Sequence, residues 1–248
     1  MSIQFNDTSS DKNGLIQVCE AKLFGNDYGA ISGNTKRLAT FTRLMNAGLN
    51  RFTSLAMQYE TRWQFHDANY TTHPEAYTSL SAGQNDYALS DLHLQLRNVY
   101  VLNSDGKKVP LQPADEFDFS NKGMSIDEYF STDGLPKYYD KKGRSIKIYP
   151  APSASETTLA DGLFVTYTST PSYFTDADTT KEAGIPLIFA DYPAIFASRQ
   201  YARDNTMAKK LNDFTTEQAE MEAMIETFYS SRDRDDRPTM KARKRNYV

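Results

Sequence analysis

Three acidic side chains stand close together in one segment of the chain, where two of them could serve as an acid and a base. They are Asp115, Glu116 and Asp118. General acid–base catalysis needs both carboxyl groups within hydrogen-bond reach of one bound substrate, so it depends on a fold that brings them to a cleft. No flanking motif indicates such a cleft, and a solvated acidic loop is the favoured interpretation.

Two glycine-containing patterns near the N-terminus miss the spacing of known catalytic loops. The stretch from Gly25 to Lys36 lacks the G-x-x-x-x-G-K-[ST] spacing with which backbone amides cradle a phosphate. Within it, Ser32 stands one position too late for a nucleophile elbow. The sequence therefore favours a loop over a phosphate-binding or acyl-transfer site.

The candidate metal-binding residues also lack the spacing of known metal sites. The chain has three histidines, His66, His73 and His93, without the HExxH spacing of a zinc site. Asp176 and Asp178 begin a calcium-like loop, but Lys181 stands where that loop needs glycine. We therefore expect no metal site, no cofactor and no enzymatic activity.

Length and composition indicate a globular protein that needs no cross-links. With 248 residues the chain can bury a hydrophobic core, and its net charge of −4 leaves the body of the protein acidic. Cys19 is the only cysteine, which excludes a disulfide within one chain. No secretory signal pattern and no membrane-spanning apolar run is evident, so we expect synthesis in the cytoplasm and no contact with a membrane.

The N-terminal part of the sequence predicts two helices. The first lies between Asn13, a suitable N-cap, and Gly25, which follows its last turn. The second runs over residues 34–63 with apolar residues at spacings of three and four. Gly48 stands on that apolar stripe. Glycine at this position has two interpretations, and both stay open. Its missing side chain lets another helix approach closely, or the helix tolerates the glycine at a modest cost in stability.

Alternating patterns after Pro74 predict strands. Leucine recurs at every second position over 92–96, whereas Val99 and Val101 have the opposite parity, so a bulge near residue 97 or 98 would bring both sets to one buried face. Turns at 103–106 and 140–143 predict two hairpins, and a further strand covers residues 163–170.

The stretch YPAPSASETTLADGLFVTY, residues 149–167, is interpreted as a hairpin of this β-rich region. Pro150 and Pro152 lack the N–H that a strand ladder needs and therefore end one strand. Gly162 precedes the next strand.

Helical spacing returns towards the C-terminus. Asp191 can cap a helix whose first turn contains Pro193 and whose pattern continues to residue 211. A second helix is predicted to begin at a capping box from Thr215 to Gln218. Its apolar stripe consists of Met221, Met224, Ile225, Phe228 and Tyr229. The stripe could grip a partner helix, but burial in the protein's own bundle is the favoured interpretation.

These patterns predict an α+β fold: a helical bundle formed by the N- and C-terminal helices, with an inserted antiparallel β-rich module and an extended C-terminal tail. We expect four parts, the N-terminal helices in 1–75, the β-rich module in 76–185, the C-terminal helices in 186–231 and the tail in 232–248.

The tail is basic and nearly without apolar residues, so it cannot form a core of its own. Its candidate contact residues are Arg232, Arg234, Arg237, Lys241, Arg243, Lys244, Arg245, Tyr247 and Val248. The charges fit a solvated terminus, a contact with nucleic acid, or docking into an acidic groove of a partner protein. The acidic body weakens the case for nucleic acid alone, because an unselective DNA binder offers a broader basic face.

The order of these parts resembles a known family. A helix pair is followed by Trp63 and Phe65, then by strands that include GRSIKIYPAPS and LFVTYTSTP, then by helical IPLIFADYPAIFASRQYA. Over residues 13 to 230 this order is similar to the head-to-tail adaptor proteins of tailed bacteriophages, and among them to the tail tubular A type of short-tailed phages.

The resemblance implies a structural role in the virion, at the junction of head and tail. It implies a ring of subunits, usually twelve, that lies between the portal protein and a tail or nozzle protein and lets DNA pass through its lumen without sequence recognition. In such adaptors the C-terminal segment reaches onto the portal, a role that falls here on residues 232–248. The polar tip of 149–167 would then contact a neighbouring subunit or a tail protein.

Two other functions stay open. The acidic and aromatic residues of the β-rich region could belong to a tail component that binds or hydrolyses glycans, with Asp115 or Glu116 in catalysis. Alternatively, the basic segment KARKRNYV could bind duplex DNA in a host DNA-associated protein.

Overall fold

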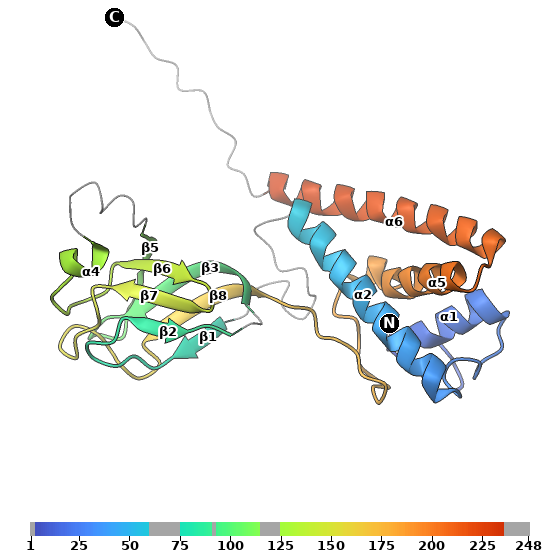
Figure 1. Ribbon diagram of the computed structural model, residues 1–248, viewed down its shortest axis with the longest axis horizontal. Helices are drawn as coiled ribbons and strands as arrows, with labels where there is room; N and C mark the ends of the chain where they lie inside the picture. Colours follow the sequence, from blue (N-terminus) through green and yellow to red (C-terminus); the bar gives the residue numbers. More distant parts are fainter. Residues whose placement is uncertain (1–2, 60–74, 91–92, 115–124, 236–248) are drawn as a thin grey trace, which may run out of the picture. The chain divides into compact units, whose positions relative to one another are not determined.

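The computed structural model describes residues 3–59, 75–90, 93–114 and 125–235. These residues form helices and mostly antiparallel strands, which confirms the predicted α+β class. The chain divides into two compact units, one of Met1–Tyr70 with Pro171–Val248 and one of Thr71–Thr170 (Figure 1). The helical unit therefore draws on both ends of the chain and the β unit on its middle.

Within the described residues, four α-helices form the helical unit. They are α1 (Leu15–Phe24), α2 (Thr35–Tyr59), α5 (Tyr192–Asp204) and α6 (Ala208–Asp235). Helix α5 packs against each of the other three, so it is the centre of the bundle. Its core is rich in aromatic side chains, and the largest of those that are fully buried are Phe5, Phe41, Phe52, Phe189, Tyr192 and Tyr229. A short 3-10 turn, η2 (Leu187–Phe189), leads into α5.

Residues 171–185, assigned to the β-rich module in the sequence analysis, lie in the helical unit. The ring of Phe174 stacks on Phe5 with 4.5 Å between centroids. Asn46 on α2 holds the same residue, since its side-chain amide donates to the Phe174 carbonyl at 2.9 Å and accepts the Phe174 N–H at 2.8 Å. These contacts fasten the returning segment to α2.

The N-cap predicted for the first helix is wrong by one residue. Gly14 takes the N-cap position of α1 without a side-chain hydrogen bond, while the Asn13 N–H donates to Asp7 at 2.9 Å. A loop built around the Asp7 carboxylate thus fixes the helix start. At the other end Gly25 adopts a left-handed conformation, with φ of 66°, as the sequence predicts.

The C-terminal helices also begin and end differently from the prediction. Helix α5 stops at Asp204, because Thr206 has a positive φ of 56° and the Met207 N–H bonds back to the Ala202 carbonyl at 2.9 Å. Helix α6 then runs unbroken from Ala208, so the capping box predicted at Thr215 is wrong.

Two predicted caps are replaced by other contacts. Thr215 lies inside α6, and its hydroxyl donates to the Leu211 carbonyl at 2.7 Å. Asp191 holds the N-cap position of α5 and Pro193 lies in its first turn, as predicted, but the Asp191 side chain makes no cap hydrogen bond.

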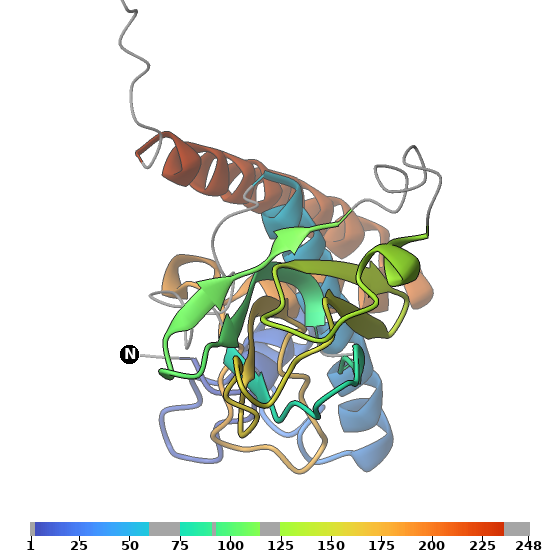
Figure 2. The same cartoon turned by 90° about the vertical axis from the view of Figure 1, so that its left-hand side faces the viewer.

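The β unit contains two four-stranded sheets (Figures 1 and 2). The first has the order β1–β8–β3–β4, with strands Glu75–Thr78, Leu163–Ser169, His93–Leu102 and Lys108–Pro110. The second has the order β2–β7–β6–β5, with strands Asp86–Ala88, Ser145–Tyr149, Tyr138–Lys142 and Gln112–Pro113. All pairs are antiparallel except β5 with β6.

The predicted bulge in β3 is confirmed. The register against β8 shifts between Leu96 and Asn98, and Val99 and Val101 then enter the core of the β unit. The turn after Asn103 is confirmed as well, since the Asn103 side chain accepts the N–H of Lys107 at 2.8 Å and closes the β3–β4 hairpin.

The interpretation of 149–167 as a hairpin is wrong, because the strands at its two ends belong to different sheets. β7 ends at Tyr149 before Pro150, as predicted, but β8 pairs with β1 and β3 and not with β7. Residues 150–162 therefore link the two sheets. Gly162 lets this link turn tightly, since a Cβ there would lie 1.9 Å from the Thr158 carbonyl oxygen.

The middle of the chain is not wholly β. A one-turn helix, α4 (Ile126–Tyr129), begins at Ser125 with a complete capping box to Glu128. The pattern S-I-D-E carries the signal for this box, which the sequence analysis missed.

Several residues named in the sequence analysis lie outside the described part of the chain. They are Trp63, Phe65, His66, His73, Asp115, Glu116, Asp118 and, in the tail, Arg237, Lys241, Arg243, Lys244, Arg245, Tyr247 and Val248.

Candidate interaction surfaces

The described residues contain no cluster of three or more side chains that could hold a metal ion. Among the helices of that same part of the chain, none has both the length and the apolar character to span a bilayer. The features described next are surfaces of the molecule and the polar contacts that hold its elements in place.

A partly buried polar cluster fixes α2, α5 and α6 relative to one another. The Glu222 carboxylate on α6 accepts two hydrogen bonds from the Arg51 guanidinium on α2. Nη2 donates to Oε2 at 2.8 Å and Nε donates to Oε1 at 3.3 Å. It also accepts the hydroxyl of Tyr192 on α5 at 2.8 Å and the amide of Gln218 at 2.7 Å. One carboxylate thus joins three helices.

The contacts to Glu222 also determine its protonation. Burial alone would raise the pKa of this carboxyl, but the hydrogen bonds from Arg51, Gln218 and Tyr192 outweigh it and lower the pKa to about 2. Burial and the neighbouring carboxylate raise the pKa of Tyr192, so its hydroxyl stays a donor. The cluster is therefore built around a permanently charged Glu222 at neutral pH.

Gly48 marks the closest approach of α2 and α5. A Cβ at this position would lie 3.1 Å from the Cα of Pro193 and 3.2 Å from the Cβ of Phe196. Contacts this short leave almost no room for a side chain. Of the two interpretations left open by the sequence, the close approach of a second helix is confirmed.

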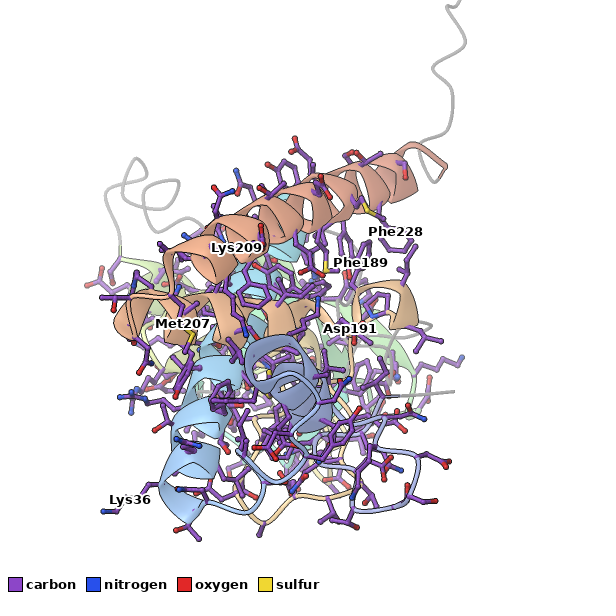
Figure 3. The ribbon with its side chains drawn as sticks, turned by 90° about the vertical axis from the view of Figure 1, so that its right-hand side faces the viewer. Lys36, Phe189, Asp191, Met207, Lys209 and Phe228 are labelled. Atoms are coloured by element: carbon purple, nitrogen blue, oxygen red, sulfur yellow. The ribbon has the colours of Figure 1, made fainter. Side chains whose placement is uncertain are left out.

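An apolar groove lies between η2 and the C-terminal half of α6. Its volume is about 440 Å³, and it is lined by Ile188, Phe189, Ala223, Met224, Thr227, Phe228 and Ser231. The rings of Phe189 and Phe228 form its floor in a T-shaped pair with centroids 5.3 Å apart, and Figure 3 shows both side chains on the same side of the helical unit. Among the described side chains, none that lines this groove is charged.

The groove corrects one prediction about the stripe on α6. Ile225 and Tyr229 are buried in the bundle as expected, but Met224 is exposed at the groove. The sequence indicated an apolar stripe on α6. It did not indicate that this stripe extends beyond the face of α6 that α5 and α2 cover. The groove was consequently not predicted.

Helix α2 and the central part of α6 carry opposite charge. Between its ends α2 contains Lys36, Arg37, Arg43 and Arg51 and no acidic residue. The stretch of α6 from Asp213 to Glu226 contains five acidic residues and no basic one. Charge is therefore segregated within the helical unit as well as along the chain.

The β unit has an open hollow of about 550 Å³. Its lining includes Phe130, Asp133, Lys137, Pro150 and Glu156. The Glu156 carboxylate accepts the Leu135 N–H at 2.7 Å, so it braces the loop that forms one wall. Polar, aromatic and charged groups together suit a contact surface for another protein.

Of the tail residues predicted to dock, Arg232 and Arg234 belong to the last turn of α6. The other seven follow the described part of the chain. Ser231, which precedes Arg232 in α6, lines the apolar groove.

Comparison with known proteins agrees with the resemblance seen in the sequence. A family model described as SU10 adaptor protein matches residues 19–245. No curated protein matches the chain. The family match confirms the resemblance to head-to-tail adaptors of phages, while the narrower resemblance to the tail tubular A type stays a prediction.

Proposed function

The chain belongs to the SU10 adaptor protein family, and on this premise we propose that it joins the head of a phage to its tail as a ring between the portal and a tail or nozzle protein. The observation that carries the proposal is the family match, which covers both the helical and the β unit. A structural role also accords with the kind of surfaces described above, which are suited to contact with other proteins.

The proposed ring contains twelve copies of the chain, the usual number in head-to-tail adaptors, around a lumen that DNA crosses without sequence recognition. The acidic body of the chain supports passage of DNA, because like charges keep the phosphate backbone from adhering to the wall. The location that follows is the head–tail junction of the virion.

We assign portal contact to the C-terminal tail. Its residues Arg232, Arg234, Arg237, Lys241, Arg243, Lys244, Arg245, Tyr247 and Val248 combine positive charge with an apolar end. A segment that becomes ordered on binding loses conformational entropy, but it can cover much of a partner's surface. Repetition around a ring turns weak contacts of this kind into firm attachment.

Co-sedimentation with the portal tests this function. Purified portal particles are mixed with the full-length chain and centrifuged, and the chain should pellet with the portal in a fixed ratio to portal subunits. A chain that stays in the supernatant at low and moderate salt would contradict the proposal. Bovine serum albumin at the same concentration controls for trapping in the pellet.

A further inference from the structure

The apolar groove between η2 and α6 has no occupant within the described part of the helical unit, and we propose that it receives the outer face of α2 from a second copy of this chain. This inference rests on the proposed ring and assigns the two surfaces through which neighbouring copies touch. Such a contact is head-to-tail, since each copy offers its groove to one neighbour and its α2 to the other.

Exposure of the groove supports an interface. Leu187, Ile188 and Met224 are 55%, 63% and 51% exposed, and all three are large apolar side chains at or beside the groove. Scattered apolar residues are normal on a protein surface, but here three of them adjoin a hollow whose lining, as far as the structure describes it, is uncharged. Covering them would remove a contiguous apolar area from water.

Charge complementarity indicates that another copy of this chain occupies the groove. Lys36 and Arg43 are exposed on α2, and within the described residues neither side chain forms an ion pair. Asp213 and Glu220 are exposed on α6 and likewise have no ion-pair partner in that part of the chain. The chain thus carries both halves of an electrostatically complementary contact, unused within one copy.

The two surfaces lie apart on the helical unit. In Figure 3, Phe189 and Phe228 mark the groove at one side, and Lys36 at the start of α2 lies at the opposite corner. Glu220 precedes Met224 by one helical turn, so the acidic charge borders the apolar groove. Separated complementary faces permit a chain of contacts that closes into a ring, whereas a self-complementary face would stop at a dimer.

An aromatic residue strengthens the α2 side of this contact. Tyr173 is exposed, and its hydroxyl donates to the Asn50 side chain at 2.6 Å, which fixes the ring beside α2. Tyr and Arg contribute much of the binding energy at protein interfaces, and a ring held in place loses little entropy on contact. Arg43 and Tyr173 therefore suit a neighbouring groove with an acidic border.

Site-directed cross-linking tests the proposal in the full-length chain. Cysteine is introduced as Arg43→Cys, as Met224→Cys or as both together, and rings formed on portal particles are treated with a short bis-maleimide. The native Cys19 is fully buried, and burial raises the pKa of its thiol to about 12, so the unaltered chain is the unreactive control. Electron microscopy of the same samples shows whether rings have formed.

The double variant should give a ladder of cross-linked multimers on a denaturing gel, and each single variant should stay monomeric. Dimers from Met224→Cys alone would mean that two grooves face each other and would overturn the proposal. Rings without any cross-linked multimer of the double variant would also overturn it while leaving the adaptor function intact. Absence of rings in every sample, the unaltered chain included, would overturn both.

A charge exchange gives an independent measurement. Arg43→Glu should reduce ring formation at least several-fold, and adding Glu220→Arg to the same chain should restore it. The matched control is Lys12→Glu, a lysine of the N-terminal loop outside both surfaces, which should leave ring formation unchanged. Equal ring formation by Arg43→Glu and the control would contradict the assigned surfaces.

Discussion

Gly48 decides how closely α2 and α5 approach in the centre of the helical unit. Replacing it as Gly48→Leu puts a branched side chain where Pro193 and Phe196 leave 3.1 and 3.2 Å for a Cβ. Overpacking of this kind costs about 1–3 kcal/mol, so we expect the free energy of unfolding to fall by about 2 kcal/mol. Urea denaturation followed by far-UV circular dichroism measures it.

The neighbouring residue provides the control for this substitution. Ala47 is exposed on the same helix, and Ala47→Leu should change the free energy of unfolding by less than about 0.5 kcal/mol. Equal effects of the two substitutions would show that the close helix approach does not contribute to stability.

Glu222 gives the helical unit a predictable dependence on pH. Its folded pKa of about 2 lies below the ordinary value of 4.5, so its contribution to stability is complete above pH 4.5 and is lost as the pH falls towards 2. Between pH 7 and pH 3 the unaltered chain should therefore lose more unfolding free energy than Glu222→Gln does. Urea denaturation at the two pH values measures the difference.

An exposed carboxylate on the same helix is the matched control for the pH experiment. Glu220→Gln removes an acidic group that has no ion pair within the described residues. It should lose as much stability between pH 7 and pH 3 as the unaltered chain. If Glu222→Gln behaves in the same way as this control, the cluster of Arg51, Tyr192 and Glu222 does not depend on charge.

At the scale of elements, the capping box that the structure contains can be compared directly with the predicted one that it lacks. Ser125 caps α4 by accepting the Glu128 N–H, whereas Thr215 lies inside α6. Ser125→Ala should lower the free energy of unfolding of the β unit by about 1 kcal/mol, a typical cost of a lost N-cap. Thr215→Ala should change that of the helical unit by less than about 0.5 kcal/mol. Thermal denaturation of the two variants measures both, and the reverse order would contradict the boundaries of α4 and α6.

Local patterns in the sequence were enough to place most elements. The flanking Asn13 and Gly25 predicted α1, the spacing of three and four predicted α2, and the change of parity after Leu96 predicted the bulge in β3. These features depend on residues near one another in the chain. The end of α5 depends on the backbone conformation of Thr206, which has no strong residue signal, and so the break before α6 was predicted too late in the chain, after residue 211.

Contacts between distant residues explain the remaining errors. The proline-rich stretch after Tyr149 looked like a hairpin because its flanks have strand patterns, but strand pairing is decided by the partners β1, β2, β3 and β6 elsewhere in the chain. The apolar groove was missed for a related reason. Periodicity identifies an apolar stripe, but only the packing of η2 and α6 shows which part of it stays uncovered, as at Met224.

At the scale of the whole molecule, the C-terminal tail should contribute to attachment and not to folding. Removing residues 236–248 leaves α6 complete to Asp235, so the circular dichroism spectrum and the melting temperature should match those of the full chain. The apparent Kd for portal particles should rise at least tenfold, because the basic tail residues are lost. Binding of a labelled chain at increasing portal concentration measures this Kd.

A second variant separates charge from length in the tail. Changing Lys241, Arg243, Lys244 and Arg245 to glutamine keeps the tail but removes most of its charge. It should weaken portal binding and reduce the dependence of that binding on salt. Portal binding that is unchanged in both tail variants would contradict the assignment of the tail to the portal.

The central claim is that the chain assembles into a ring on the portal, and electron microscopy of the two purified proteins tests it most directly. Portal particles incubated with the full-length chain should show an additional ring on one end that is absent from portal particles alone. If the portal and the chain stay separate species over a range of salt concentrations, the assignment of this chain as a head-to-tail adaptor ring is contradicted.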